Sequence, residues 1–344
     1  MKKLINIEKV CFNYRRTVLD AMETINSKSL PFLIITNKSK QLLGTITDGD
    51  IRRYILEGND LTQEVNSAMN KSPIYCYEKQ KNLHYKKLIS ISSITKFLPI
   101  LGNEKKIKYI LLHEKEEEND IALIMAGGFG KRLGKKTKNI PKPLIKVGNK
   151  AILDIILKKV GKSKFKKVFI STHYLHEKIS NHLKKSIKNH NIGLIKEKKP
   201  LGTAGCISLI NEPYENLVVI NGDVLSDINL NAFIEFHKES KNDITLSVAQ
   251  YTYQIPFGLI ELDRLHRLKN IQEKPKLHYN VISGIYCLKK KVCDLVSTEY
   301  LDMTTLISNA ISIKKKIGVF PIYEYWQDIG NPDDLIKANK NYTN

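Results

Sequence analysis

The sequence predicts an α/β protein with a Rossmann-like, mostly parallel sheet, preceded by a smaller α+β unit. From Asp120 onward, short apolar runs suited to buried strands alternate with helical patterns. Before that point, a pattern of strand, turn and strand occurs twice. The charge run HEKEEEND at 113–120 separates the two parts and is typical of a solvated linker. We therefore expect two domains, over residues 1–118 and 119–344.

Composition narrows the classes of function. The 344 residues, 42% of them hydrophobic, are enough for two buried cores. The formal net charge of +21 has two possible explanations. It could attract nucleotides or sugar phosphates, but we favour a lysine-rich composition in which the lysines are solvated over the whole surface. No stripe of arginine and aromatic residues accompanies them, so we expect no nucleic-acid partner. Five cysteines without a C-x-x-C pair, and no signal-peptide or membrane-spanning pattern, predict a cytoplasmic protein without a membrane partner.

In the N-terminal part, each copy of the repeat is predicted to have a helix followed by two strands. The predicted helices cover 17–27 and 82–93, and the predicted strand pairs cover 32–36 with 41–47 and 97–101 with 107–112. After the first strand pair, Thr47 can cap a helix over 48–57 that ends at Gly58.

The C-terminal part is predicted to begin with a strand over 121–125, followed by a helix over 151–161 whose isoleucines recur on one face. Short apolar runs predict further strands over 167–171, 217–220 and 243–249. In such sheets, ligands bind beyond the carboxyl ends of the strands. This rule places the segment 127–132 and the pair Gly222-Asp223 on one rim.

The segment IALIMAGGFGKRLGKKTKNIPKPL, at 121–144, has the layout needed to hold a triphosphate. Glycines let backbone N–H groups approach phosphate oxygens, and Lys131 and Arg132 supply positive charge. The flanking prolines fix the backbone around Lys142. The spacing does not fit G-x-G-x-x-G, and Arg132 stands where a Walker-type loop needs Ser or Thr. A structural glycine turn is the alternative.

A carboxylate follows the predicted strand at 217–220, in Asn221-Gly222-Asp223. Its position at the carboxyl end of a strand, after a glycine, suits Mg²⁺, which favours one or two carboxylates together with phosphate oxygens. The alternative is that Asp223 is a turn residue.

Together these motifs resemble the sugar-1-phosphate nucleotidyltransferase family over residues 120–344. The family pattern of AGGxGTRL, a Thr and PKPL matches at Ala126, Gly127, Gly128, Gly130, Arg132, Leu133, Thr137 and 141–144. Two positions depart from it: Lys131 stands at the usual Thr, and Lys135-Lys136 stand where Pro-Leu is frequent. Later motifs follow in family order at 197–205 (EKKPLGTAG), 221–223 (NGD), 273–275 (EKP) and 326–330 (WQDIG).

The resemblance implies a role for each matched residue. Arg132 and Lys142 would be catalytic, and Asp223 and Asp328 would hold Mg²⁺. The nucleotide would be bound by Ala126, Gly127, Gly128, Gly130, Lys131, Glu197, Gly202 and Thr203, with Glu197 and the Gly202 backbone on the base. The sugar phosphate would be bound by Gly258, Glu273, Lys274 and Gly284. The alternative for the pair Glu273-Lys274 is a surface ion pair, which contributes little by itself.

The N-terminal part resembles a tandem cystathionine-β-synthase (CBS) domain pair, through PFLIITNKSKQLLGTITDGDIRRYILEG. The resemblance implies an adenosine-nucleotide site at Thr47 and Asp50. In the second copy His113 and Glu116 fall at the matching places, so we expect that copy to have lost the site. A helix cap explains Thr47 and Asp50 equally well. A structural role as a dimerising module is a further alternative.

The union of both parts resembles the glucosamine-1-phosphate guanylyltransferases of bacterial legionaminic acid biosynthesis. The resemblance implies transfer of a nucleotidyl group from GTP to glucosamine 1-phosphate, with Mg²⁺ as cofactor and pyrophosphate as second product. Within the enzyme class, the alternatives are a uridylyltransferase and a mannose-1-phosphate guanylyltransferase. Outside it, they are an adenine-nucleotide sensor with an inactive transferase domain and a nucleic-acid-binding protein.

Overall fold

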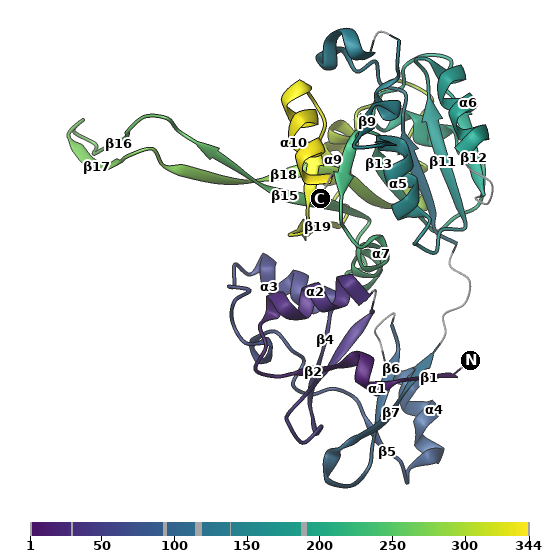
Figure 1. The fold of residues 1–344 in the computed structure, drawn as a ribbon, viewed down its shortest axis with the longest axis vertical. Coiled ribbons are helices and arrows are strands. Elements are labelled where there is room, and N and C mark those ends of the chain that lie inside the picture. The colour runs from purple at the N-terminus through teal and green to yellow at the C-terminus, as the bar shows by residue number, and fades with distance from the viewer. Residues whose placement is uncertain are drawn as a thin grey trace.

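The computed structural model describes residues 2–28, 30–91, 95–113, 119–137, 139–186 and 191–342. An N-terminal unit lies beside a larger C-terminal unit that begins at Ile121 (Figure 1). Most of the expected linker, at 114–118, lies outside the described residues. Among the helices within the described ranges, none combines the length and the apolar character that a membrane crossing requires.

The N-terminal unit contains one strand topology twice. Its elements are β1 (Lys2–Ile5), α1 (Ile7–Val10), β2 (Cys11–Asn13), α2 (Val18–Lys28), β3 (Phe32–Thr36), β4 (Leu42–Thr47), α3 (Asp48–Leu56), β5 (Cys76–Tyr77), α4 (Lys81–Ser90), β6 (Phe97–Leu101) and β7 (Ile107–His113). In the first half, β2 pairs in parallel with β3, and β3 pairs antiparallel with β4. In the second half, β5 pairs in parallel with β6, and β6 pairs antiparallel with β7. The repeat expected from the sequence is therefore present in the strand pairing.

Corresponding residues of the two halves meet or repeat the same geometry. Phe32 and Phe97, the first residues of β3 and β6, stack with their ring centroids 3.7 Å apart. In the turns that follow these strands, Lys40 and Lys105 adopt the same left-handed conformation, with φ values of 58° and 57°. The stacked rings belong to a shared apolar cluster, so the two halves fold as one unit.

Strand register corrects one assignment made from the sequence. Thr47 lies opposite the first residue of β3, and Leu112 lies opposite the first residue of β6. Leu112 is therefore the counterpart of Thr47, and the placement of His113 there is wrong by one residue. Cross-strand pairing, and not local similarity of letters, decides which positions correspond. Glu116, the other residue of that assignment, lies outside the described residues.

The C-terminal unit is built on a seven-stranded sheet. Its elements are β8 (Ile121–Met125), β9 (Lys146–Val147), β10 (Lys150–Ala151), α5 (Ile152–Val160), β11 (Lys167–Thr172), α6 (His176–Ser186), β12 (Ile192–Lys196), β13 (Asn216–Asn221), β14 (Val224–Ser226), α7 (Leu230–Glu239), β15 (Ile244–Gln254), β16 (Leu259–Leu262), β17 (Leu268–Gln272), β18 (Lys276–Lys289), α8 (Lys290–Cys293), α9 (Met303–Ser312), β19 (Ile317–Ile322), β20 (Trp326–Asp328) and α10 (Pro332–Tyr342). The sheet order is β12-β11-β8-β13-β18-β15-β19.

The expected mostly parallel α/β sheet is confirmed, with one exception. Neighbouring strands are parallel except where β18 runs antiparallel to both β13 and β15. The strand expected over 243–249 is longer than its apolar core, because β15 continues to Gln254. Beyond the sheet, β15 and β18 form a long hairpin that projects from the C-terminal unit and ends in β16 and β17 (Figure 1).

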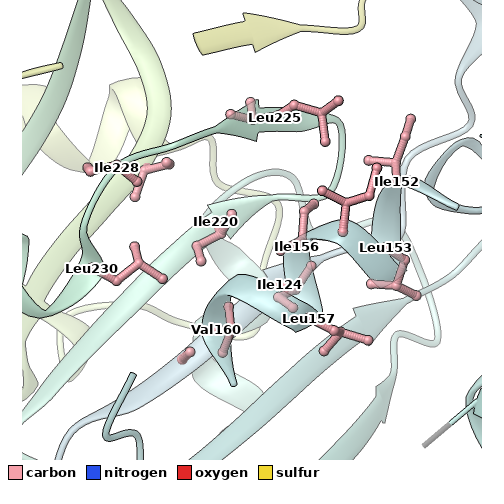
Figure 2. Packing of buried hydrophobic residues seen from close by; sticks show 14 of the residues in the cluster. Ile124, Ile152, Leu153, Ile156, Leu157, Val160, Ile220, Leu225, Ile228 and Leu230 are labelled. Atoms are coloured by element: carbon pink, nitrogen blue, oxygen red, sulfur yellow. The ribbon is translucent and has the colours of Figure 1, made fainter. Parts of the chain in front are cut away.

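The helix α5 packs on the strands that lead to the rim. Ile152, Ile156 and Val160 of this helix share one apolar cluster with Ile124 of β8 and Ile220 of β13 (Figure 2). A second cluster, which includes residues of α9, covers the other face of these strands. Burial on both faces, worth roughly 1.5–3 kcal/mol for each large side chain, holds the carboxyl ends of β8 and β13 in place.

The two units are joined by a buried ion cluster around Arg52 of α3. The Arg52 guanidinium, 0% exposed, donates to Asp48 Oδ1 at 3.0 Å, to Glu324 Oε1 at 2.5 Å and to the Pro321 carbonyl at 2.9 Å. It also lies over the Phe320 ring, 4.5 Å from the centroid. Asp48 and Arg52 come from the N-terminal unit and the other groups from the C-terminal unit, so this cluster ties α3 to the edge strand β19 and to the loop after it.

We expect Arg52→Met to destabilise the chain by about 3–5 kcal/mol, because it leaves buried carboxylates without their cation. The loss should shrink at lower pH, where those carboxylates become protonated. Urea unfolding of both proteins at neutral and at acidic pH measures it. Arg53→Met is the matched control, because Arg53 forms an exposed pair with Asp50 at 2.6 Å, which is worth below about 1 kcal/mol. Equal losses in the two variants would contradict the buried cluster.

Candidate active site

A pocket of about 420 Å³ lies at the carboxyl ends of β8 and β13. Its walls come from 125–129, from Lys142 and Pro143, from Glu197 with 200–203, from 221–223, and from Tyr300 and Asp302. Segments that are far apart in the sequence therefore meet at one rim. This is the rim at which we expected a ligand, because ligands of such sheets bind beyond the carboxyl ends of the strands.

The glycine loop is shaped by contacts that require glycine. Gly130 has a φ of +63°, and a Cβ there would lie 2.8 Å from Thr137 Cγ2. The Thr137 hydroxyl donates to the carbonyls of Gly130 and Gly134, at 2.9 and 3.1 Å, and thereby fixes the turn. At Gly128, nothing described lies within 4 Å of where a Cβ would be. The loop thus presents open backbone to the pocket, as phosphate oxygens require.

Gly222 allows Asp223 to sit at the rim. A Cβ at Gly222 would lie 2.4 Å from the Met125 carbonyl oxygen, which accepts a hydrogen bond from the Gly222 N–H at 2.9 Å. This bond ties the end of β13 to the end of β8. Directly after it, the Asp223 carboxylate contacts the Lys142 ammonium. Lys142 is 8% exposed and sits in a turn that Pro141 opens, so its position is fixed by the backbone around it.

Asp328 lies beside Asp223 although the two are distant in the sequence. The strands β14 and β20 pair antiparallel, and the Ile329 N–H donates to the Asp223 carbonyl at 3.0 Å. Burial raises the pKa of the Asp328 carboxyl above its ordinary value, and the negative charge of Asp223 raises it further. Lys142 and Arg132 act on this pKa in the opposite direction. Two acids and two bases therefore share one electrostatic environment.

The paired carboxylates fit a divalent cation. Mg²⁺ prefers one or two carboxylates together with phosphate oxygens and water. Asp223 lines the pocket, whereas Asp328 lies beside Asp223 and, like Arg132, is not among the residues of the pocket wall. Asn221 lies next to them, and within the described residues its buried Oδ1 accepts no hydrogen bond. Gly284 leaves room for this amide, because a Cβ there would lie 2.7 Å from Asn221 Nδ2. An unpaired amide oxygen beside two carboxylates indicates a place for a polar ligand.

Glu197 is buried beside the glycine loop. Its carboxylate accepts from the Ser171 hydroxyl at 2.6 Å and from the Leu201 N–H at 3.0 Å. A Cβ at Gly127 would lie 2.9 Å from its Oε1. These bonds fix the loop that follows Glu197. Each carboxylate oxygen can accept a further hydrogen bond, so Glu197 is also able to receive the donors of a nucleobase. Ser171 was not among the expected site residues, although it is a polar residue at the carboxyl end of a strand.

The loop at 200–203 is held by hydrogen bonds to the segment that contains Tyr300 and Asp302. Gly202 has a φ of +75°, and a Cβ there would lie 2.6 Å from the Leu301 carbonyl oxygen. The Thr203 hydroxyl lies 3.3 Å from Asp302 Oδ1, and the Tyr300 hydroxyl donates to Asp302 Oδ2 at 3.0 Å. Tyr300 and Asp302 line the pocket through this pairing between distant loops. No local pattern marks them in the sequence.

Of the residues expected to bind the sugar phosphate, the structure brings Gly284 to the rim and leaves the others apart. Gly258, Glu273 and Lys274 lie on the projecting hairpin and do not line the pocket (Figure 1). Glu273 and Lys274 are exposed, with their charged atoms 3.9 Å apart. The side chain of Lys131 lies outside the part of the chain whose side chains are described.

Thr47 and Asp50 form a reciprocal cap at the start of α3. The Asp50 N–H donates to the Thr47 hydroxyl at 3.2 Å, and the Thr47 N–H donates to the Asp50 carboxylate at 2.8 Å. Arg53 also pairs with Asp50. The structure therefore shows the helix cap that was one of the two interpretations. The adenosine site at these residues stays a prediction.

Known proteins share this C-terminal unit. A model of the family described as Nucleotidyl transferase matches residues 121–344. The chain is 32% identical over 224 residues to D-glycero-alpha-D-manno-heptose 1-phosphate guanylyltransferase of Aneurinibacillus thermoaerophilus, covering 64% of this chain and 96% of that protein. It is 27% identical over 223 residues to mannose-1-phosphate guanylyltransferase catalytic subunit beta of Drosophila pseudoobscura pseudoobscura, covering 62% and 60%. It spans 62% of the length of a relative from Sulfolobus acidocaldarius that is 30% identical.

Solved structures show the same fold. The crystal structure of HddC from Yersinia pseudotuberculosis aligns with a TM-score of 0.51 at 26% identity, over 64% of this chain and 99% of that one. A second structure of that protein, complexed with GMP-PN, aligns with a TM-score of 0.51 at 24% identity and adds a likeness of fold alone. The N-terminal unit lies outside the matched family region.

We expect Gly222→Ala to destabilise the chain by about 1–3 kcal/mol, because its Cβ would overlap the Met125 carbonyl and force β8 and β13 apart. Urea unfolding measures the loss. Gly128→Ala is the control, since its Cβ would meet nothing within 4 Å among the described residues, and its effect should stay within about 0.5 kcal/mol. If both variants unfold like the wild type, the close approach of β8 and β13 is wrong.

Asp328→Asn should raise thermal stability in metal-free buffer while abolishing activity. Because the folded-state pKa of Asp328 is raised, the wild type loses stability as the pH rises from the ordinary Asp range through this higher pKa. The Asn variant has no such loss, so its advantage should be absent below the ordinary Asp pKa and grow above it. Melting temperatures across acidic to neutral pH measure the difference. A variant that is less stable than the wild type at every pH would contradict the unfavourable placement of the ionised Asp328, which burial and the Asp223 charge produce.

Proposed function

The chain belongs to the nucleotidyl transferase family, and from this premise we propose that it transfers a nucleotidyl group from a nucleoside triphosphate, GTP by preference, to a sugar 1-phosphate. The observation that supports the proposal most strongly is the rim pocket, where the glycine loop, Lys142, Asp223 and Glu197 meet. Open backbone, a buried cation and a carboxylate pair are what a triphosphate and its counter-ion need.

In the proposed reaction, a phosphate oxygen of the sugar 1-phosphate attacks the α-phosphorus of the triphosphate in line. A new oxygen–phosphorus bond forms, and the bond between the α-phosphorus and the oxygen that bridges to the β-phosphorus breaks. Pyrophosphate leaves, and a nucleotide-sugar is released. The nucleophile is already an anion, so the reaction needs no general base. The protein contributes positioning and neutralisation of charge.

The residues divide these tasks. Backbone N–H groups of 127–130 would hold phosphate oxygens, and Lys142 and Arg132 would neutralise the charge that develops as the bond to pyrophosphate breaks. Asp223 and Asp328 would hold Mg²⁺, which when bound supplies further positive charge to the phosphates. Lys142 is held ready for its task, because it is buried and paired with Asp223 before any phosphate arrives.

Guanine is the proposed base and glucosamine 1-phosphate the proposed acceptor. Guanine carries N1–H and N2–H₂ donors, and Glu197 supplies carboxylate oxygens at the pocket wall. Two relatives of this chain are named as guanylyltransferases, one for a heptose 1-phosphate and one for mannose 1-phosphate. The choice of glucosamine 1-phosphate, and with it a role in bacterial glycan or legionaminic acid biosynthesis, rests on the sequence resemblance. Mannose 1-phosphate and UTP are the alternatives to be separated.

For the N-terminal unit we propose a CBS-like pair with an adenine nucleotide at Thr47 and Asp50. The duplicated topology supports the first part of this proposal. For the second part, the nucleotide would compete with the cap bonds that Thr47 and Asp50 make to each other. A sensor with an inactive transferase unit is the rival. The retention of Lys142, Asp223 and Asp328 in one electrostatic environment favours an active enzyme.

A matrix of nucleoside triphosphates against sugar 1-phosphates, read by pyrophosphate release, tests the proposal. We expect turnover with GTP and a hexose 1-phosphate to exceed turnover with UTP or ATP. Absence of turnover in every cell of the matrix would leave the nucleotide sensor as the better account. Turnover that is fastest with UTP would contradict the choice of guanine and would still support nucleotidyl transfer.

Lys142→Met should lower kcat by roughly 10²–10³, because the developing charge loses a preorganised cation. Single-turnover kinetics with saturating GTP separates this loss from weaker binding. Lys146→Met is the matched control, since Lys146 is an exposed lysine of β9 in the same segment and should leave kcat unchanged. A similar fall in both variants would show that net charge, and not the placed ammonium, drives the reaction.

A further inference from the structure

The hairpin that projects from the C-terminal unit, here called the arm, covers residues 250–282 and contains β16 and β17 at its tip (Figure 1). Its two strands pair antiparallel without interruption from Val248 opposite Ile282 to Gln254 opposite Lys276. A two-stranded ribbon has no third layer against which to bury its side chains. The arm therefore depends on some other surface to cover whatever apolar residues it carries.

The base of the arm has one apolar face and one polar face. On one face, Tyr251 lies opposite Tyr279, and Tyr253 lies opposite Leu277. The tyrosines on this face are 52–54% exposed. On the other face, Thr252 lies opposite His278, and the positions on either side of this pair are also polar. Such alternation is typical of a strand pair with one face packed against protein.

The tip of the arm repeats this arrangement. Ile260 lies opposite Ile271, and Leu262 lies opposite Leu268, all on one face. Each of these side chains is between 47% and 61% exposed. Contiguous exposed apolar side chains on this scale mark a surface that binds protein. Both segments of the arm are thus built to be covered, and nothing in the same chain covers them among the described residues.

The arm also carries the residues to which the sequence resemblance gives the sugar phosphate. Gly258 and Glu273 lie together, since a Cβ at Gly258 would be 3.3 Å from Glu273 Oε2, and the Lys274 N–H donates to the Phe257 carbonyl at 3.3 Å. Glu273 precedes Val281 by eight residues, and Val281 is the partner of Ala249, the last buried residue of β15. The strand β18 is extended from Val281 back to Lys276, so at the rise of an extended strand Lys276 lies about 17 Å beyond the body of the unit, and Glu273 comes further along the arm. In this extended position, neither Glu273 nor Lys274 lines the pocket of its own chain (Figure 1).

The root of the arm is held so that the arm points away from its own pocket. The Ser283 side chain is 1% exposed and hydrogen-bonds the Ser247 hydroxyl. The Ser283 carbonyl accepts from the Trp326 indole N–H at 2.8 Å, and the Ser247 hydroxyl donates to the Ile285 carbonyl at 2.7 Å. Folding the arm back over its own site would break these buried bonds or the ladder above them, at a cost of roughly 1–3 kcal/mol for each buried group left unpaired.

We propose that the arm of one copy crosses to a second copy of this chain, buries its apolar face there, and delivers Glu273 and Lys274 to the sugar-phosphate side of the partner's pocket. The inference deepens the proposed function and rests on it. A second copy is the occupant that explains both observations, because it alone offers a pocket that lacks those residues. Two-fold symmetry then lets each arm complete the other site, and the assembly closes as a dimer.

Complementation between two inactive variants tests the exchange. One variant carries Asp223→Asn, and the other carries Glu273→Gln with Lys274→Met. Co-expression with two different tags allows the mixed dimer to be isolated. If the arm acts on the partner's site, the mixed dimer has one complete site and shows about half of the specific activity of the wild type. If the arm acts on its own site, every site has one defect, and the mixed dimer is as inactive as its parents.

Light scattering provides a second test that does not depend on activity. The wild type should have twice the chain mass of 39.4 kDa, and Tyr251→Asp should reduce it to a monomer. Thr252→Asp, the neighbouring residue on the polar face, is the matched control and should stay dimeric. A monomeric wild type, or a dimer that survives Tyr251→Asp, would overturn the proposal. A wild type inert with every substrate pair would instead refute the proposed function, and light scattering alone would then decide the arm exchange.

Discussion

The half-buried position of the Asp328 carboxylate beside Asp223 is the constraint on which the rest of the site depends. The pairing of β14 with β20 forces the two acids together, and burial makes the ionised form of Asp328 unfavourable. The apolar clusters on both faces of β8 and β13 supply the stability that makes such an arrangement tolerable. Lys142 and Arg132 lower the pKa of Asp328, but the combined effect of burial and the Asp223 charge is larger, because the net shift is upward. Binding of a cation to such a site stabilises the folded state, because the cation neutralises the two carboxylates.

The rim is the part of this protein that the sequence foretells best, because its signals are local. A continuous apolar run gives β8 its observed bounds, and glycines stand where the chain needs a positive φ or a close approach, as at Gly130 and Gly222. Pro141 likewise predicts the turn that holds Lys142. Asp328 is different, because only its order relative to the other motifs singles it out. Its position beside Asp223 is decided by strand pairing.

What the sequence leaves out are directions and distant partners. The alternation around Tyr251 and Tyr253 is visible in the letters, but an ordinary half-buried strand has the same pattern, and nothing local says that β15 leaves the sheet after Ala249. Arg52 meets Glu324 across 272 positions of chain, which no short window can detect. Tyr300 and Asp302 reach the pocket only because another loop holds their segment there.

The ion cluster around Arg52 has an evolutionary implication. Removing one charge from the assembled chain leaves its partners buried without a counter-ion. Separating the two units instead lets water hydrate Arg52, Asp48 and Glu324 together. Detachment of the whole N-terminal unit is therefore less disruptive than a single substitution inside the contact. A polar contact of this kind lets a module be gained by gene fusion, or lost by deletion, without changes in the core of the catalytic unit. The heptose relative, almost all of which aligns with only part of this chain, fits such a history.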